Sequence, residues 1–242
     1  MKKWIFILFL FVCKGVYSAY YVGAEINYEI IDSSKDFYRI TWSAFTECSG
    51  TVGGFVPINI NFSSGCPTQN VTGTFVKFNY LNSLCPGGST SCNSPTSTNI
   101  GIRQNVVEAY VTLPRTCGFA IISFENCCIP INAGPGSYGT NINGAGCVSI
   151  YAETVINLSL IGGNNSAKIL NKKFLNGAIG VKNDYNFIAE DRDHDSVVYE
   201  TIDALCNHTS TYSYINGKPF FMVDPALSMN KKTGELSFTP TK

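Results

Sequence analysis

The densest cluster of chemically capable side chains in this sequence lies between Glu190 and Asp195. Carboxylates stand at Glu190, Asp191, Asp193 and Asp195. In an extended backbone, residues two apart share a face, so the three aspartates would converge on one side. Ca²⁺ prefers several oxygen ligands, which clustered carboxylates and carbonyls supply. The pattern therefore predicts a Ca²⁺ site formed by these four residues.

The same run, which we call the acidic turn, has a second interpretation as a solvated turn between strands with no ion. An EF-hand loop is excluded, because the twelfth position counted from Asp191 is Ile202 rather than glutamate and no helical pattern flanks the run. Apolar alternation begins at Val197, directly after the acidic turn. Under either interpretation, the acidic turn marks a junction between a loop and a strand.

Catalytic chemistry finds little support in the sequence. The two histidines are His194, inside the acidic turn, and His208, in a polar Asn-His-Thr-Ser stretch, and neither is placed as a general base should be. The sequence contains no GxSxG, HExxH or phosphate-cradling glycine motif. Paired carboxylates also serve glycoside hydrolysis, but a repeat-type turn favours ion ligation. We expect a protein that is not an enzyme and has no catalytic or organic-cofactor residues.

The composition favours strands and excludes a nucleic-acid partner. Lys+Arg and Asp+Glu both number 17, so the formal net charge is zero, whereas nucleic-acid binding requires a basic face. Aromatic residues make up 13% of the chain, and Thr, Ser, Asn and Gly are plentiful. This balance is typical of strands joined by turns. The length of 242 residues suggests one large domain or two modest ones.

The N-terminus has the organisation of a secretory signal peptide over residues 1–18. Lys2 and Lys3 precede an apolar run, Trp4–Cys13, and small residues in 16–18 allow cleavage after residue 18. This run is too short to span a bilayer, which needs about 20 apolar residues. We therefore expect an exported protein, secreted or at the cell surface, with no membrane span once the signal is removed.

Export changes how the cysteines are interpreted. In an oxidising compartment they form disulfides, each stabilising a small domain by about 2–5 kcal/mol. The disulfide candidates are Cys48, Cys66, Cys85, Cys92, Cys117, Cys127, Cys128 and Cys147. Six residues separate Cys85 from Cys92, so this local pair is the first predicted disulfide. With Cys206 the mature chain has nine cysteines, an odd number, so at least one stays free or pairs with another chain.

Alternating apolar residues predict the strands. Those of the first part are 25–31, 37–46, 55–62, 74–80, 105–113, 119–124 and 148–160. Within the second of these, we expect Tyr38, Ile40, Trp42 and Ala44 to form the buried face.

Small polar residues at 161–166 mark the predicted domain boundary. The remainder has the length of one small sandwich domain. Its predicted strands are 185–189, 197–201, 220–223 and 235–239. A hairpin turn is predicted at 230–234, and a helical pattern at 166–174.

Several blocks of the first part form a joint pattern: Gly23–Glu29, Phe37–Thr41, Glu47–Gly50, Leu84–Cys92, Tyr110–Cys117 and Asn126–Cys128. This pattern covers most of residues 19–160. It resembles the N-terminal domain of large Bacteroidetes surface proteins, which are associated with gliding motility and type IX secretion. The resemblance implies an all-β fold that begins with an Ig-like β-sandwich at residues 19–163.

The acidic turn with Ser196–Tyr199, and the ending Thr233–Pro240, resemble cadherin-like or putative-Ig repeats. The resemblance implies a smaller cadherin-like sandwich at 164–242, and it favours Ca²⁺ at the acidic turn. The family motif has glycine where this chain has His194, which costs turn flexibility. Such proteins continue through further repeats to a sorting domain, so the resemblance implies the N-terminal portion of a repeat-type protein, or a short paralogue.

These features together predict a non-catalytic exported adhesin or structural protein of a bacterial cell surface. Its partner would be an extracellular or cell-surface ligand, either protein or glycan. The alternative is a carbohydrate-binding accessory module of an exported polysaccharide system, since aromatic rings stack on sugars. Most of the aromatic residues alternate with polar ones in strands, however, so filling of the core explains them.

Overall fold

The computed structural model describes most of the chain after the predicted signal peptide. The described residues are 21–48, 55–63, 65–81, 88–94, 96–97, 99, 101–127, 149–160, 162–171, 180–211 and 227–240. The predicted signal peptide (1–18) and the predicted strand at 220–223 lie outside them. In the described part of the chain, no helix is both long and apolar enough to cross a membrane.

The larger part of the structure is one antiparallel sheet of seven strands in the order β1-β2-β5-β4-β3-β6-β7. Its strands are β1 (Tyr21–Asp32), β2 (Phe37–Glu47), β3 (Phe55–Phe62), β4 (Gln69–Leu81), β5 (Ile102–Thr112), β6 (Phe119–Cys127) and β7 (Ser149–Asn157). A short 3₁₀ turn, η1 (Arg115–Cys117), leads from β5 into β6. Strand β3 alternates buried and less buried positions over Phe55–Ile60, as a strand with one buried face does, whereas β2 is buried at five successive positions, 42–46.

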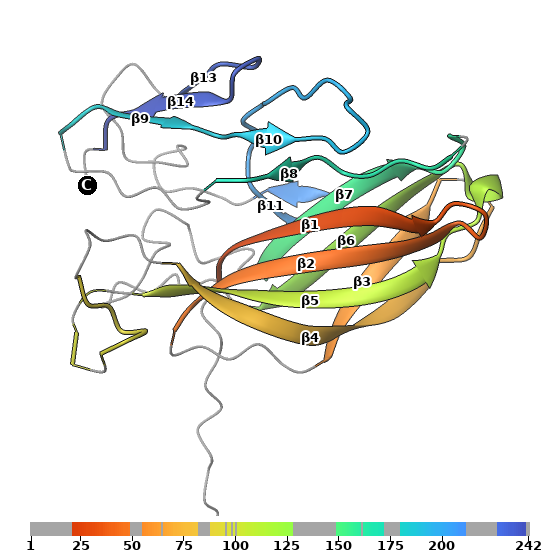
Figure 1. Ribbon diagram of the computed structural model, residues 1–242, viewed down its shortest axis with the longest axis horizontal. Coiled ribbons are helices and arrows are strands. Elements are labelled where there is room, and N and C mark those ends of the chain that lie inside the picture. The colour runs from red at the N-terminus through yellow and green to blue at the C-terminus, as the bar shows by residue number, and fades with distance from the viewer. Residues whose placement is uncertain are drawn as a thin grey trace, which may run out of the picture.

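The sheet folds over on itself to make a sandwich (Figure 1). Strands β1, β2, β5 and β4 form one layer, β3, β6 and β7 form the other, and the β3–β4 ladder joins them. The two ends of the strand order, β1 and β7, lie side by side. This is the ABED and CFG order of immunoglobulin-type sandwiches. The predicted all-β sandwich is confirmed.

The core lies between the two layers and is centred on β2. Tyr38, Ile40, Trp42 and Ala44 are each at most 1% exposed, so the predicted buried face is confirmed. The Trp42 ring meets that of Phe124 from β6, with ring centroids 3.9 Å apart. Aromatic pairs of this kind add stability beyond the area they bury. Trp42 therefore joins the two layers.

In the described residues of the C-terminal segment (162–171, 180–211 and 227–240), the strands are short. They are β8 (Lys168–Ile169), β9 (Asn183–Asn186), β10 (Ala189–Glu190), β11 (Leu205–Asn207), β12 (Ser210–Thr211), β13 (Ser228–Met229) and β14 (Glu235–Phe238). They pair as β10–β8, β11–β12 and β13–β14–β9. The predicted hairpin turn at 230–234 is confirmed: the Gly234 N–H donates to the Asn230 carbonyl, and Gly234 has φ 72°.

Two predictions for this segment are wrong. The helix predicted from residue 166 is replaced by strand β8, because Lys168 and Ile169 pair with β10; its last residues, 172–174, lie outside the described part. Residues 197–201 form no strand, and Val198 is 72% exposed. The physical reason is that these residues have no neighbouring strand to pair with in the described part of the chain. The Tyr199 N–H donates one isolated hydrogen bond, to the Lys231 carbonyl.

Candidate functional site

The acidic turn is a closed turn rather than an extended strand. The Asp191 Oδ1 accepts the backbone N–H groups of Asp193 (2.8 Å) and Asp195 (3.3 Å). His194 has φ 64°, in the left-handed region that favours glycine. The expected convergence of three aspartates on one extended face is therefore wrong, because a carboxylate that caps its own backbone folds the chain into a turn.

Asp193 faces the predicted domain boundary. Its carboxylate accepts the Asn165 backbone N–H at 2.7 Å and the Asn165 side-chain amide at 2.9 Å. Asn165 is only 6% exposed. Both carboxylate oxygens of Asp193 thus serve a partner within the chain.

Ca²⁺ binding at Glu190, Asp191, Asp193 and Asp195 stays a prediction. Within the described ranges, no three His, Cys, Asp or Glu side chains are grouped as a metal ion requires. Two of the four carboxylates are already used, one by the turn and one by Asn165. These hydrogen bonds agree with the second interpretation, in which the turn is closed by the protein itself.

Asn165 and Ser166 cover the free edge of β1. The Asn165 Oδ1 accepts the Ile30 N–H, and the Ser166 Oγ accepts the Tyr28 N–H, both at 2.9 Å. The Ser166 N–H donates in return to the Tyr28 carbonyl at 3.0 Å. An outer strand otherwise exposes unpaired N–H and C=O groups to other chains. Two side chains here replace a neighbouring strand.

Gly163 fixes how closely this segment approaches the sandwich. It has φ 81°, and a Cβ placed on it would lie 2.1 Å from the Ile30 Cδ1. Any larger residue would clash and would also strain the backbone. The predicted boundary, 161–166, is therefore packed against β1 over its described residues, rather than separated from it.

Charged side chains strengthen the same junction. The Glu29 carboxylate, on β1, accepts a hydrogen bond from Arg39 at 2.6 Å and forms an ion pair with Arg192 of the acidic turn. The Lys168 Nζ lies 3.7 Å away. The Arg39 hydrogen bond holds the pKa of Glu29 below its usual value, and the three positive charges act in the same direction. A groove of about 410 Å³ runs beside Glu29, Lys168 and Arg192.

A second junction lies on β7. The Glu153 Oε2 accepts a hydrogen bond from the Tyr151 hydroxyl at 2.5 Å and lies 2.7 Å from the Nδ1 of His208, in the β11–β12 hairpin. Burial raises the pKa of Tyr151, and the adjacent Glu153 raises it further. The C-terminal segment therefore contacts both outer strands of the sandwich, β1 and β7.

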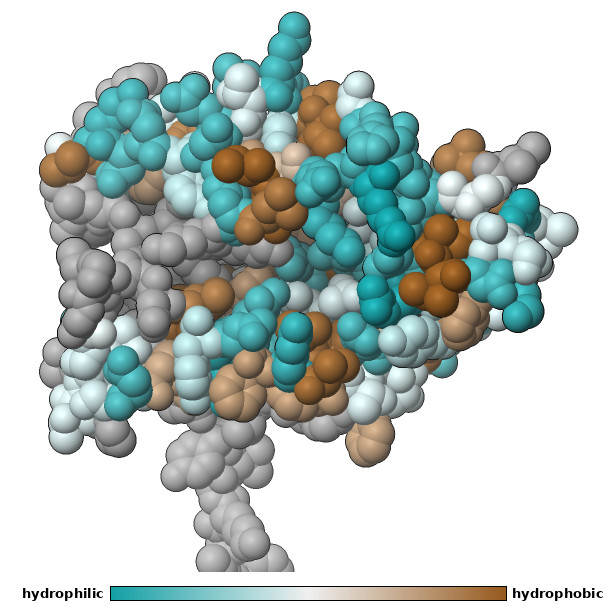
Figure 2. Space-filling view, in the orientation of Figure 1, coloured by the Kyte–Doolittle hydropathy of each residue, from teal (hydrophilic) through white to brown (hydrophobic). Residues whose placement is uncertain are grey.

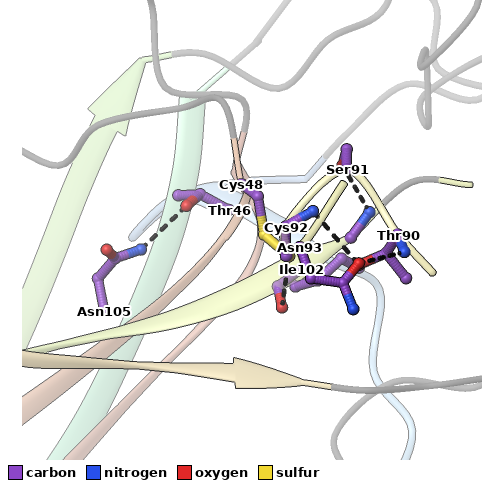
Figure 3. The surroundings of a disulfide bond; sticks show 9 residues. Thr46, Cys48, Thr90, Ser91, Cys92, Asn93, Ile102 and Asn105 are labelled. Atoms are coloured by element: carbon purple, nitrogen blue, oxygen red, sulfur yellow. Dashed lines mark hydrogen bonds between the residues drawn. A yellow bond between two sulfur atoms is a disulfide. The ribbon is translucent and has the colours of Figure 1, made fainter. Parts of the chain in front are cut away.

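Disulfides join loops at the two ends of the sandwich. Cys48 bonds Cys92 (Figure 3), and Cys66 bonds Cys117. The predicted Cys85–Cys92 pair is wrong, because β2 and β5 are neighbours and bring Cys48 beside the loop that enters β5. Gly101 allows this approach, since a Cβ there would lie 2.3 Å from the Cys92 Sγ.

Cys206 is also disulfide-bonded and is fully buried, although the sequence did not place it among the candidates. It is the only cysteine of the sequence after the predicted boundary. The contact between β11 and β7 removes that isolation. Of the other candidates, Cys85, Cys128 and Cys147 lie outside the described residues, as does the side chain of Cys127.

The visible face of the molecule is mainly hydrophilic, and its apolar residues appear as separate patches (Figure 2). A search against protein-family models, curated proteins and solved structures finds no match to this chain. The functional argument therefore depends on the geometry and on the sequence patterns. The residues of the two junctions (Glu29, Asn165, Ser166, Arg192, Glu153 and His208) carry no local sequence signal beyond being polar.

Proposed function

We propose that the protein is a non-catalytic, exported adhesin or structural protein of a bacterial cell surface, forming the N-terminal part of a repeat-type surface protein. The observation that supports this most is the pair of junctions that fasten the C-terminal segment to both outer strands of the sandwich. A fixed joint between successive β units suits a protein that spans distance outside a cell. Two disulfides in the sandwich and a bonded Cys206 suit an oxidising compartment.

Covered strand edges support the same proposal. A secreted β protein remains at high local concentration without cytoplasmic chaperones, so bare edges would pair with other chains. Here Asn165 and Ser166 cover the edge of β1. The export route in this proposal is type IX secretion, as in the Bacteroidetes proteins whose motifs the chain resembles.

The test is localisation together with redox state. The whole native reading frame, including whatever follows residue 242 and carrying an internal epitope tag, is expressed in a Bacteroidetes host with type IX secretion and in a matched strain that lacks that route. We expect the protein to be cleaved when intact cells are treated with protease and its cysteines to be oxidised to disulfides. In the strain that lacks the secretion route, the protein should no longer be exposed at the surface. Cytoplasmic protein with free thiols would contradict the proposal, and unchanged attachment of a deletion strain to surfaces would remove the adhesin role.

A carbohydrate-binding accessory module is the second candidate. The observation that favours it is a polar groove of about 360 Å³, lined by amide, hydroxyl and carboxylate side chains that include Asn59, Ser123 and Glu125. Small-molecule pockets are usually mostly apolar, so a groove of this character suits a ligand rich in hydroxyl groups. Selective, saturable binding of purified protein on a glycan array would favour this candidate.

A further inference from the structure

The polar groove lies where the outer face of β3, β6 and β7 meets the β11–β12 hairpin. Its walls come from both parts of the molecule, so it forms only when the C-terminal segment is docked. Lining residues that carry the argument are Asn59, Asn61, Glu125, Tyr151, Asn207 and His208. Cross-strand pairing sets the floor, because Asn59 lies opposite Ser123 and Glu125 lies opposite Tyr151.

The hydrogen-bonding groups and charges of the lining residues determine which ligands the groove can bind. Asparagine amides both donate and accept hydrogen bonds, as sugar hydroxyls do. The described lining residues include no lysine or arginine, and they include two ionisable groups, Glu125 and His208, besides Tyr151. An acidic ligand would be repelled by Glu125, and the lining residue that can carry a positive charge, His208, is already paired with Glu153. A hydroxyl-rich ligand with neutral or positive charge fits.

Two carboxylates near the floor differ in availability. Glu153 is occupied, since its Oε2 contacts both the Tyr151 hydroxyl and His208. Glu125 is exposed, and among the described residues its carboxylate makes no hydrogen bond or ion pair. A carboxylate accepts hydrogen bonds only, so its best partner is a cationic donor. Glu125 thus supplies the charge preference of the groove.

We propose that this groove binds an amino-sugar unit of a glycan. The ammonium group of the sugar bonds to Glu125, and its hydroxyls bond to the amides of Asn59 and Asn207. The proposal rests on the second candidate function, the carbohydrate-binding module, for which it names the class of ligand. Its site nevertheless belongs to the folded chain and is testable on the purified protein.

The test is calorimetric titration of the full, disulfide-bonded protein with three oligosaccharides of matched length, at a pH where the amine is protonated. They are glucosamine oligomers, their N-acetylated counterparts, and galacturonic acid oligomers. We expect glucosamine oligomers to bind about tenfold more tightly than the N-acetylated ones, which corresponds to one charge-assisted hydrogen bond. Galacturonic acid oligomers should not bind measurably.

Variants assign the preference to the groove. Glu125→Gln should weaken binding of glucosamine oligomers about tenfold and leave binding of N-acetylated ones unchanged. Asn59→Ala should weaken binding of both. Glu235→Gln is the matched control, because it removes the same charge from exposed strand β14, outside the groove, and should change nothing. Circular dichroism and melting curves check that each variant is folded.

Several outcomes would overturn the proposal: unchanged glucosamine binding by Glu125→Gln, equal binding of the uronic acids, or binding of a lysine-rich peptide but of none of the sugars. Different results would contradict the proposed surface function. A surface-exposed protein that mediates attachment but binds no amino sugar removes only the groove assignment. A cytoplasmic protein that binds amino sugars in vitro removes only the surface function.

Discussion

The sandwich and the C-terminal segment are held together by different physical means. In the sandwich, long ladders enclose a continuous apolar core that runs from Tyr21 to Leu158. Beyond Leu158, the buried apolar residues of the described chain are Cys206 and Leu236 alone. Since burial of apolar area is the main source of stability, the sandwich can fold from its own core. The segment depends on polar contacts with the sandwich and on a disulfide.

This difference shows that hydrogen bonds from polar side chains can hold a segment with few buried apolar residues against a folded domain. Asp193 orients Asn165, which in turn bonds to the β1 edge. Each such hydrogen bond contributes about 1 kcal/mol, far less than a buried aromatic residue. The segment should therefore be the part that opens first, and the following changes test the contrast in order of expected effect.

The largest effect should come from Trp42→Ala. Removing this ring leaves a cavity against Phe124 and should cost about 3–5 kcal/mol of unfolding free energy. Chemical denaturation monitored by far-ultraviolet circular dichroism measures it. Thr41→Ala, on the opposite face of β2, is the control and should change stability by less than about 1 kcal/mol. If the two variants were equally stable, the core would not be where the structure places it.

Asn165→Ala should separate the two regions. It leaves the partly buried Ile30 N–H and the Asp193 carboxylate without their partner, which costs about 1–3 kcal/mol. Hydrogen exchange should then increase in residues 183–211 and along the β1 edge, while β2 and β5 stay protected. Asn164→Ala is the neighbouring control, since its side chain makes only a 3.4 Å contact with the Tyr28 hydroxyl. Uniform loss of protection would show that the two regions unfold together.

Ca²⁺ should act on the segment if the acidic turn binds it. At about ten times its dissociation constant, the ion would stabilise by ~1.4 kcal/mol, so EDTA should lower the melting temperature and added Ca²⁺ should restore it. Asp195→Asn should abolish the shift, whereas Asp203→Asn, outside the acidic turn, should keep it. No shift at millimolar Ca²⁺ would leave the turn closed by its own hydrogen bonds alone.

Acid should weaken the junction slightly, through Glu29. Its pKa in the folded protein is lowered from about 4.5, so its carboxylate stabilises the fold above that pH. The stabilisation is lost as pH falls through the lowered value. We expect less than about 1 kcal/mol, because the cationic partners are partly exposed. Melting temperatures of the wild type and of Glu29→Gln, measured between pH 6 and pH 3, test this. If the two melting temperatures fell in parallel with pH, the role of Glu29 would be contradicted.

Local patterns in the sequence were sufficient for most of the sandwich. The predicted strand at 55–62 coincides with β3, because its alternation is clear and glycines lie close to both ends. β4 begins at Gln69 instead of Thr74, since its polar first residues are fixed by pairing with β3 rather than by their own propensity. Short-range spacing predicts a Cys85–Cys92 disulfide, but the pairing of β2 with β5 brings Cys48 to Cys92 instead.

The junctions could not be predicted because they depend on distant partners. Asn165 has the composition of a linker, yet its amide bonds to Ile30, 135 positions earlier, and to Asp193, 28 positions later. The sequence marks the acidic turn as chemically important, but from sequence alone its carboxylates could bind either an ion or the backbone. Only the fold shows which groups stand opposite them.

The cover on β1 has a consequence for synthesis. Tyr28 and Ser166 are 138 positions apart, so the first strand emerges long before the residues that shield it. A chain synthesised from its N-terminus presents an unpaired β1 edge throughout that interval. A chain terminated before Ser166 would keep the strands of the sandwich but lack the cover on β1, so we expect it to associate with other chains at that edge.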